Sequence, residues 1–255
     1  MSQNIADGAF PERVHIAPVG FEIDRVVLPF MRMKGERIHL IVRQDSNKRG
    51  INCQERIVEE LERAKKPYKI HKAELDLLKL IYTCRKIIEG ELSSGNRVFV
   101  NISSGGSIQG VACHFATLTF KRGVSAYYAY PERYIEYVDP NRQQNSAGLS
   151  KIEMVPHYSI DLPTPQEMSF LLLVGQSRDP RKSLLLRSCL EGGLFSVEGK
   201  SKPYGHVILE CRYIRPLEEK ELLVVEGRGR NSRVLLTEKG KNTLLLNGFE
   251  VLSQN

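Results

Sequence analysis

The chain has 255 residues, of which 41% are hydrophobic and 26% are charged, a composition that excludes collagenous and wholly disordered proteins. At about 100 to 200 residues per domain, this length predicts two domains. The net charge of +7 permits a polyanionic partner without requiring one. No apolar run reaches the roughly 18 residues of a membrane span, and the first ten residues lack a signal-peptide pattern. We therefore expect a cytoplasmic protein without a membrane partner.

Five cysteines stand at positions 53, 84, 113, 189 and 211, without a C-x-x-C pair or closely spaced histidines. This odd count and wide spacing argue against a disulfide framework and against a metal cluster, so we predict no metal ligands. Free cysteine behaves as a small hydrophobic residue. Each of the five is therefore expected to be a buried structural thiol.

The first half of the chain alternates apolar strands with amphipathic helices. We predict strands at residues 13–18, 37–43, 68–71, 97–102 and 124–130, and helices at residues 21–34, 54–65, 75–91 and 107–121. This repetition indicates an α/β fold, with a Rossmann-like and mostly parallel sheet. Residues 134–137 and 152–155 are expected to add an antiparallel edge, with a loop at 139–148 between them.

The turn after the fourth strand has the composition of a ligand site. It reads Asn101-Ile102-Ser103-Ser104-Gly105-Gly106-Ser107 and opens a helix. Glycines let a ligand approach the backbone, hydroxyls donate hydrogen bonds, and a helix N-terminus offers unpaired N–H groups to a phosphate. The alternative is a tight turn in which Ser107 caps the helix.

The turn after the first strand should form the opposite wall, since ligands of open α/β sheets bind outside the carboxyl ends of the strands. It contains Gly20 and Phe21 but lacks the full G-x-G-x-x-G pattern. Arg43 ends the second strand, where an NAD site would have an acidic residue. A Rossmann enzyme with a nucleotide cofactor is therefore disfavoured, and we expect no required cofactor. His15, in the middle of the first strand, is expected to be a buried or sheet-face residue.

Past residue 157 the pattern changes to helices followed by a hairpin. We predict helices at 165–175, 181–191 and 204–220, and strands at 222–226 and 233–237. Thr164 and Glu167 have the spacing of a capping box, and Pro216 should kink the third helix. This order is typical of a winged helix-turn-helix. The predicted domains are residues 12–157, which sense a ligand, and 158–255, which form the winged helix.

Cations and polar side chains on this second domain could contact DNA. We place Val207, Cys211, Ile214 and Leu217 on the buried face of the third helix. The opposite face, with the hairpin cations, gives the candidate DNA contacts: His206, Leu209, Arg212, Tyr213, Arg228, Arg230 and Arg233. Because many winged helices bind proteins instead, a protein-interaction module remains an alternative.

Residues 216–223 and 230–240 resemble the end of a MarR-type winged helix. The resemblance includes Leu236-Thr237-Glu238-Lys239-Gly240 at the end of the wing. Glu221 stands where that family commonly has a glycine.

The first half resembles the CARF domain (CRISPR-associated Rossmann fold), on the segment Asn101–Ser107. Ser107 and Ile108 stand where many members have threonine and lysine. The whole order resembles the archaeal CARF regulators that carry a winged helix. This resemblance implies a homodimer whose shared cavity binds a cyclic oligoadenylate. The implied ligand-facing residues are Gly20, Phe21, Asn101, Ser103, Ser104, Gly105, Gly106 and Ser107.

The leading hypothesis is a transcription regulator that binds double-stranded DNA and responds to a cyclic oligoadenylate. The alternative from another class is a metal-independent ring nuclease. In that enzyme Ser103, Ser104 or Ser107 would position the 2′-hydroxyl for attack, although the motif offers no histidine or lysine as a general base.

Overall fold

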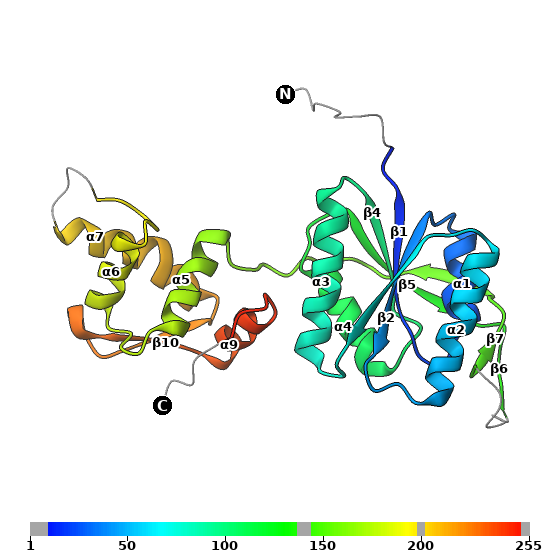
Figure 1. The fold of residues 1–255 in the computed structure, drawn as a ribbon. Helices are drawn as coiled ribbons and strands as arrows, with labels where there is room; N and C mark the ends of the chain where they lie inside the picture. The colour runs from blue at the N-terminus through cyan, green and yellow to red at the C-terminus, as the bar shows by residue number, and fades with distance from the viewer. Residues whose placement is uncertain (1–9, 137–143, 198–201, 251–255) are drawn as a thin grey trace. The chain divides into compact units, whose positions relative to one another are not determined.

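The computed structural model describes residues 10–136, 144–197 and 202–250. The chain divides into two compact units, Met1–Ile160 and Asp161–Asn255, and this division falls just past the predicted boundary. Each unit is described by itself (Figure 1).

The first unit is built on a six-stranded sheet in the order β3-β2-β1-β4-β5-β8. The first five of these strands run parallel to their neighbours, and β8 is antiparallel to β5. This order is that of a Rossmann-like fold, as the sequence predicted. The strands are β1 (Arg13–Pro18), β2 (Arg37–Arg43), β3 (Tyr68–Ala73), β4 (Arg97–Asn101), β5 (Val124–Tyr130) and β8 (Lys151–Met154).

Helices cover both faces of this sheet, with α1 and α2 on one side and α3 and α4 on the other (Figure 1). Their bounds are α1 (Asp24–Arg32), α2 (Lys48–Arg63), α3 (Leu77–Ser93) and α4 (Ser107–Leu118). Helix α2 begins earlier than predicted because the Asn47 side chain caps it, accepting a hydrogen bond of 2.9 Å from Gly50 N. Covering both faces explains why residues 38–42 of β2 are all buried.

His15 is buried inside this sheet, as predicted. Its ring packs on Phe30 and Phe99, and its Nδ1 lies 3.1 Å from the hydroxyl of Tyr127. Burial, with a smaller contribution from Arg13, lowers the pKa of His15 to about 3. The imidazole is therefore neutral in the folded protein at physiological pH.

The predicted antiparallel edge is half right. Residues 151–154 form β8 at the edge of the main sheet, but Arg133–Tyr134 (β6) pairs with Ser146–Ala147 (β7) in a separate two-stranded ribbon. The prediction of a single loop at 139–148 is wrong at β7, and residues 137–143 lie outside the described part. Contacts with distant residues hold this segment: the Ser146 hydroxyl donates to Glu22 and Gly148 N donates to Asp24, and the local sequence does not show them.

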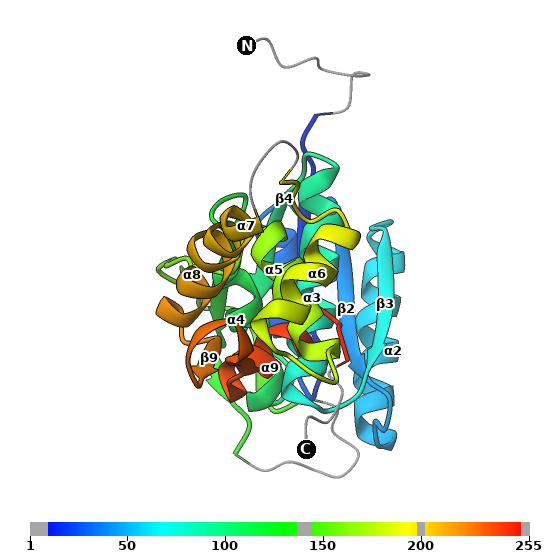
Figure 2. The same cartoon turned by 90° about the vertical axis from the view of Figure 1, so that its left-hand side faces the viewer.

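The second unit follows the predicted order of helices and a hairpin, and its elements can be traced in Figure 2. Thr164 caps α5 through the predicted capping box with Glu167. The elements are α5 (Pro165–Gln176), α6 (Lys182–Glu191), α7 (Lys202–Leu209), a π-helical turn η1 (Glu210–Ile214), α8 (Arg215–Glu219), β9 (Leu223–Glu226), a 3-10 turn η2 (Gly229–Asn231), β10 (Arg233–Leu236) and α9 (Glu238–Leu245).

The π-helical turn corrects the predicted face of the third helix. Pro216 has no N–H to donate, and the turn before it is wider, with Arg215 N bonded to Glu210 O. One extra residue in this turn changes which of the preceding positions face the core. Leu209, five residues before the buried Ile214, is therefore in the core instead of facing solvent, whereas Val207 and Cys211 are exposed. Tyr213 is also buried, four residues before Leu217 on the same face.

Four of the five cysteines are buried as predicted, and Cys211 is the exception. Among the described residues, no helix is both long and apolar enough to cross a bilayer. In the same part of the chain, no three His, Cys, Asp or Glu residues gather in a way that could hold a metal ion.

Candidate ligand cleft and nucleic-acid interface

A cleft of about 270 Å³ lies at the carboxyl ends of the parallel strands in the first unit. Four strand-to-helix turns with the helix starts that follow them, and one distant loop residue, form its walls. They contribute Val19, Gly20 and Phe21 after β1; Arg43, Asp45, Ser46, Asn47 and Gly50 at and after the end of β2; Leu75 after β3; Gly105, Gly106, Ile108 and Gln109 after β4; and Asn145 from the distant loop.

The turns after β1 and β4 touch through their glycines. A Cβ atom on Gly20 would lie 2.8 Å from Gly105 Cα, closer than any real Cβ contact. Gly105 itself has φ of +76°, and a Cβ there would meet Pro18. Only glycine fits at either position, and both residues leave backbone open to the cleft.

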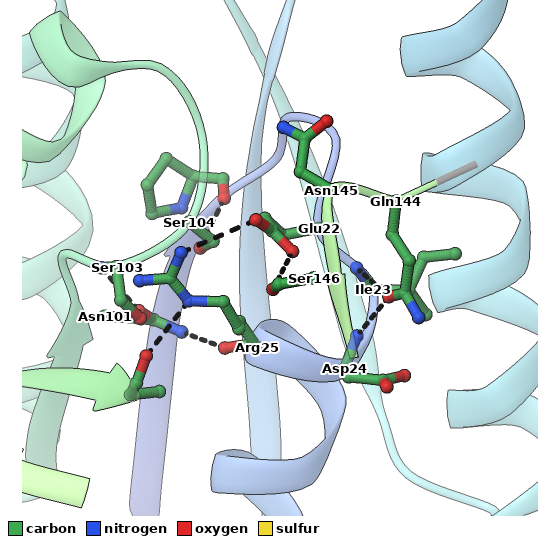
Figure 3. Close-up of polar contacts among 12 residues, drawn as sticks. Glu22, Ile23, Asp24, Arg25, Asn101, Ser103, Ser104, Gln144, Asn145 and Ser146 are labelled. Carbon is green, nitrogen blue, oxygen red and sulfur yellow. Dashed lines mark hydrogen bonds and ion pairs between the residues drawn. The ribbon is translucent and has the colours of Figure 1, made fainter. Parts of the chain in front are cut away.

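Three residues of the predicted ligand motif use their side chains inside the protein. The Asn101 amide donates to Arg25 O at 2.7 Å, and its oxygen accepts hydrogen bonds from the backbone and hydroxyl of Ser103. The Ser104 hydroxyl donates to Pro18 O at 2.8 Å and is only 2% exposed. These side chains are not lining groups of the cleft. They hold the turn after β4 against the turn after β1 (Figure 3).

The N-terminus of α4 opens at the cleft beside Gly105 and Gly106. Gly106 is the cap residue, so the alternative in which Ser107 caps the helix is wrong; Ser107 is the first helical residue and is exposed. Gln109 accepts a hydrogen bond of 2.9 Å from Gly106 N, while its buried Nε2 has no partner. The first backbone N–H groups of α4 have no carbonyl acceptor within the helix, because no helical turn precedes them. This end of the helix therefore offers donors to an anion.

The turn after β2 forms a wall that the ligand prediction omitted. Arg43 lines the cleft and is held by Asp45, with Nη2 to Oδ2 at 2.9 Å and Nε to Oδ1 at 3.1 Å. The hydrogen bonds with Asp45 raise the pKa of Arg43, and those with Arg43 lower the pKa of Asp45. Arg43 therefore brings a permanent positive charge to the cleft.

The turn after β1 is fixed from behind by a buried ion pair. Arg25 Nη1 lies 3.5 Å from Glu22 Oε1, and the Glu22 carboxylate accepts a hydrogen bond of 2.6 Å from Ser146 (Figure 3). Arg25 Nε donates to Ala129 O at 2.9 Å. These contacts tie α1, β5 and the β6–β7 ribbon together behind the cleft.

Gln144 and Asn145 extend this support to the first helix. The Gln144 oxygen accepts hydrogen bonds from Ile23 N and Asp24 N, at 3.1 and 3.0 Å, and satisfies two donors at the start of α1 (Figure 3). Asn145 accepts a hydrogen bond of 2.6 Å from Arg49, whose guanidinium lies 4.4 Å from the centre of the Phe21 ring. Phe21 therefore lines the cleft in a fixed position.

The second unit presents its cations on the hairpin of β9 and β10 and on the exposed side of the helix formed by α7 and η1. Arg228, Arg230 and Arg233 are exposed at the turn between β9 and β10, as is Arg212 in η1. His206 is half-buried, and burial together with Arg230 and Lys182 lowers its pKa. Tyr213 is in the core, with its hydroxyl 3.4 Å from Leu194 O, so the prediction that it contacts DNA is wrong.

Comparison with known families divides the chain in the same way. Residues 13–134 match the family model described as "HFX_2341_N:-like, N-terminal", and residues 173–248 match the model of the DUF6293 C-terminal winged helix domain. The second unit is a winged helix domain. The chain therefore combines a Rossmann-like unit with a winged helix domain, as the sequence predicted.

A curated relative, Uncharacterized protein MJ1513 of Methanocaldococcus jannaschii, is 26% identical over 189 residues. The match covers 64% of this chain and 56% of the relative, so the chain spans about half the length of that protein.

Solved structures show a weaker likeness. Protein VC1899 from Vibrio cholerae has a TM-score of 0.41 at 15% identity, covering 92% of this chain and 64% of that chain. Can2 from Sulfobacillus thermosulfidooxidans, solved with cyclic tetra-adenylate, has a TM-score of 0.40 at 12% identity, with the same coverage. Csm6 from Enterococcus italicus, bound to cyclic hexa-2'-fluoro-hexa-dAMP, has a TM-score of 0.40 at 10% identity and covers 84% of this chain and 57% of that chain. Likeness at this level does not extend to function.

Several lining residues escaped the sequence-based prediction. Asp45 and Asn47 follow the carboxyl end of β2, so the rule that located the other two turns could have located them too. Asn145 is more than 120 residues away from Phe21 in the sequence, and no local pattern indicates it. In the winged helix domain, Lys182 is at the start of α6, and the predicted DNA contacts do not include it because they come from the next helix and the hairpin.

Proposed function

We propose that this protein is a DNA-binding regulator whose first unit senses a cyclic oligoadenylate. The observation that carries the proposal is the cleft: open glycine backbone, the N-terminus of α4 and the Arg43 guanidinium face one space. Backbone N–H groups and a guanidinium are the groups that bind phosphates. The resemblance of residues 101–107 to the CARF motif supports an oligoadenylate as the source of those phosphates.

Two copies of the chain would complete the ligand site. One cleft of about 270 Å³ is just below the usual range for ligand pockets, so a ring of several nucleotides would extend beyond it. Ile108 and Val111, 37% and 58% exposed, continue an apolar rim from the cleft along α4, as do Leu75 and Leu77 at the start of α3. A second copy covering this rim would bring two clefts together. Sedimentation equilibrium tests this, with a dimer expected and a Val111→Lys variant expected to be monomeric.

Direct titration tests the sensing function. We expect cyclic tetra- or hexa-adenylate to bind the protein in calorimetry, and Arg43→Gln to weaken binding about tenfold, the usual value of one charge-assisted hydrogen bond. Arg63→Gln is the matched control, because Arg63 carries the same charge on the exposed end of α2 and does not line the cleft. Absence of binding for both rings would contradict the sensing function.

The ring-nuclease alternative makes a different prediction in the same experiment. Ser103 and Ser104 donate their hydroxyls internally, and no histidine or lysine is among the described residues that line the cleft. We therefore expect cyclic oligoadenylate to be recovered intact after incubation. Linear products that disappear in Ser107→Ala would instead support the nuclease.

DNA binding by the winged helix domain separates a regulator from a protein-interaction module. The expected contacts are His206 and Arg212 on the third helix, and Arg228, Arg230 and Arg233 at the hairpin. Phosphate contacts release counterions, so replacing Arg228 and Arg230 by glutamine should lower both the affinity and the salt dependence of binding. Unchanged salt dependence would favour the protein-interaction alternative.

A further inference from the structure

The winged helix domain contains a pocket of its own, of about 280 Å³. It lies between the start of α6, the segment formed by α7 and η1, and the turn between β9 and β10. Its walls are Lys182, His206, Leu209, Glu210, Gly229 and Arg230.

Backbone hydrogen bonds hold these walls in place. Lys182 N donates to Ser232 O at 2.9 Å, and Val234 N donates to Pro180 O at 2.9 Å, which joins the start of α6 to β10. The Ser232 hydroxyl in turn donates to Gly229 O at 2.7 Å, which closes the hairpin turn. The pocket is therefore formed before any ligand arrives.

The pocket carries excess positive charge. Its one acidic residue, Glu210, is paired with Lys182 at 2.8 Å. Within the part of the chain that the structure describes, Arg230 forms no ion pair. Arg230 therefore faces the pocket with an uncompensated charge beside the His206 ring.

We propose that this pocket seats one phosphate of the DNA backbone, bound by Arg230, Lys182 and protonated His206, so that DNA binding takes up a proton. This inference rests on the proposed DNA-binding function and identifies where the backbone is held. A tetrahedral phosphate accepts several hydrogen bonds at once, and it would share Lys182 with Glu210.

The charges around His206 explain why its ring would take up a proton when a phosphate binds. Burial, Arg230 and Lys182 lower its pKa in the free protein and so favour the neutral ring. Glu210 is the only acid facing the pocket among the described residues, and its charge is held by Lys182. A bound phosphate adds negative charge next to the ring and favours the imidazolium. By linkage, the affinity for DNA must then rise as the pH falls, by at most about tenfold per pH unit for one proton.

The test is fluorescence anisotropy of the full chain with a labelled 30-base-pair duplex of mixed sequence, from pH 8 to pH 6 at constant ionic strength. Backbone contacts do not depend on sequence, so no operator is needed. We expect the wild-type affinity to rise at least about threefold over this range, and the rise to disappear in His206→Gln.

Arg230→Gln and Arg228→Gln form a matched pair. Both remove one exposed cation of the same hairpin turn, but Arg228 does not line the pocket. Arg230→Gln should weaken binding about tenfold and Arg228→Gln clearly less. Glu210→Gln removes the competing acid and should strengthen binding, a gain that damaged folding would not produce.

The outcomes separate this inference from the function on which it rests. DNA binding with an Arg230→Gln effect equal to that of Arg228→Gln, and with a pH profile unchanged in His206→Gln, would overturn the phosphate pocket and leave DNA binding intact. No salt-dependent binding by the wild type at any pH would overturn both.

Discussion

The backbones of Gly20 and Gly105 approach so closely that a single added Cβ on Gly20 would lie 2.8 Å from Gly105 Cα. This contact joins the turn after β1 to the turn after β4, and both glycines line the cleft. Ser104 and Asn101 reinforce it from the protein interior. The geometry of the cleft therefore depends on two glycines, which have no side chain of their own to line it.

Gly20→Ala should force the two turns apart. We expect a loss of about 1 to 3 kcal/mol in the free energy of unfolding, typical of overpacking, together with weaker binding of cyclic oligoadenylate. Urea denaturation and calorimetry measure the two effects. Gly90→Ala is the control, because a Cβ at this helical position meets no atom within 4 Å. Equal stability of the two variants would show that the approach of Gly20 to Gly105 does not exclude a side chain at position 20.

Asp45→Asn should strengthen ligand binding. Asp45 holds Arg43 at the cleft and competes with a phosphate for its guanidinium. Because this pair is exposed and screened by solvent, we expect a gain of about threefold in affinity. Glu89→Gln makes the same change of charge at an exposed pair with Lys86 on α3, away from the cleft. A gain in both variants would point to net charge alone.

Glu221→Gly should stabilise the winged helix domain. Glu221 has φ of +59°, a left-handed conformation that costs a residue with a side chain about 1 kcal/mol relative to glycine. Its ion pair with Lys239 is exposed and contributes little. We expect a higher thermal midpoint for the glycine variant, with Glu221→Ala isolating the loss of the ion pair. A lower midpoint for glycine than for alanine would contradict the strain.

The stability of the first unit should fall as the pH falls below about 6.5. His15 has a folded-state pKa of about 3, below its unfolded value near 6.5, so the unfolded chain binds a proton that the folded chain does not. The stabilisation is complete above 6.5 and is lost towards pH 3, by at most about 1.4 kcal/mol per pH unit. Urea denaturation between pH 7 and pH 4 measures it. An NMR titration of the His15 ring near 6.5 in the folded protein would contradict it.

The sequence was sufficient to predict the order of the main elements. Apolar strands such as residues 37–43 are distinct from the amphipathic helices around them, and the Thr164 capping box identifies the start of α5. The resemblance to a MarR-type winged helix likewise located Glu221, which has the backbone conformation of the glycine usual there.

The sequence could not predict features that depend on distant contacts or on a change of helical period. The π-helical turn before Pro216 adds one residue to the repeat, so a 3.6-residue period counted back from Ile214 assigns Leu209 to the wrong face. Ser103 and Ser104 have the composition of ligand donors, but their partners are Asn101 and the carbonyl of Pro18, more than 80 residues earlier in the second case. A motif identifies the turn and not the direction of its side chains.

In the proposed function, a ligand in the cleft of the first unit changes DNA binding by the winged helix domain. The measurement is the dissociation constant for DNA with and without saturating cyclic tetra- or hexa-adenylate, for the wild type and for Arg43→Gln. We expect one of these rings to change the wild-type constant at least about fivefold, the lower end of typical coupling energies, and to have a much smaller effect on Arg43→Gln. A DNA affinity that stays the same at ligand concentrations shown by calorimetry to fill the cleft would contradict this coupling between the cleft and the winged helix domain.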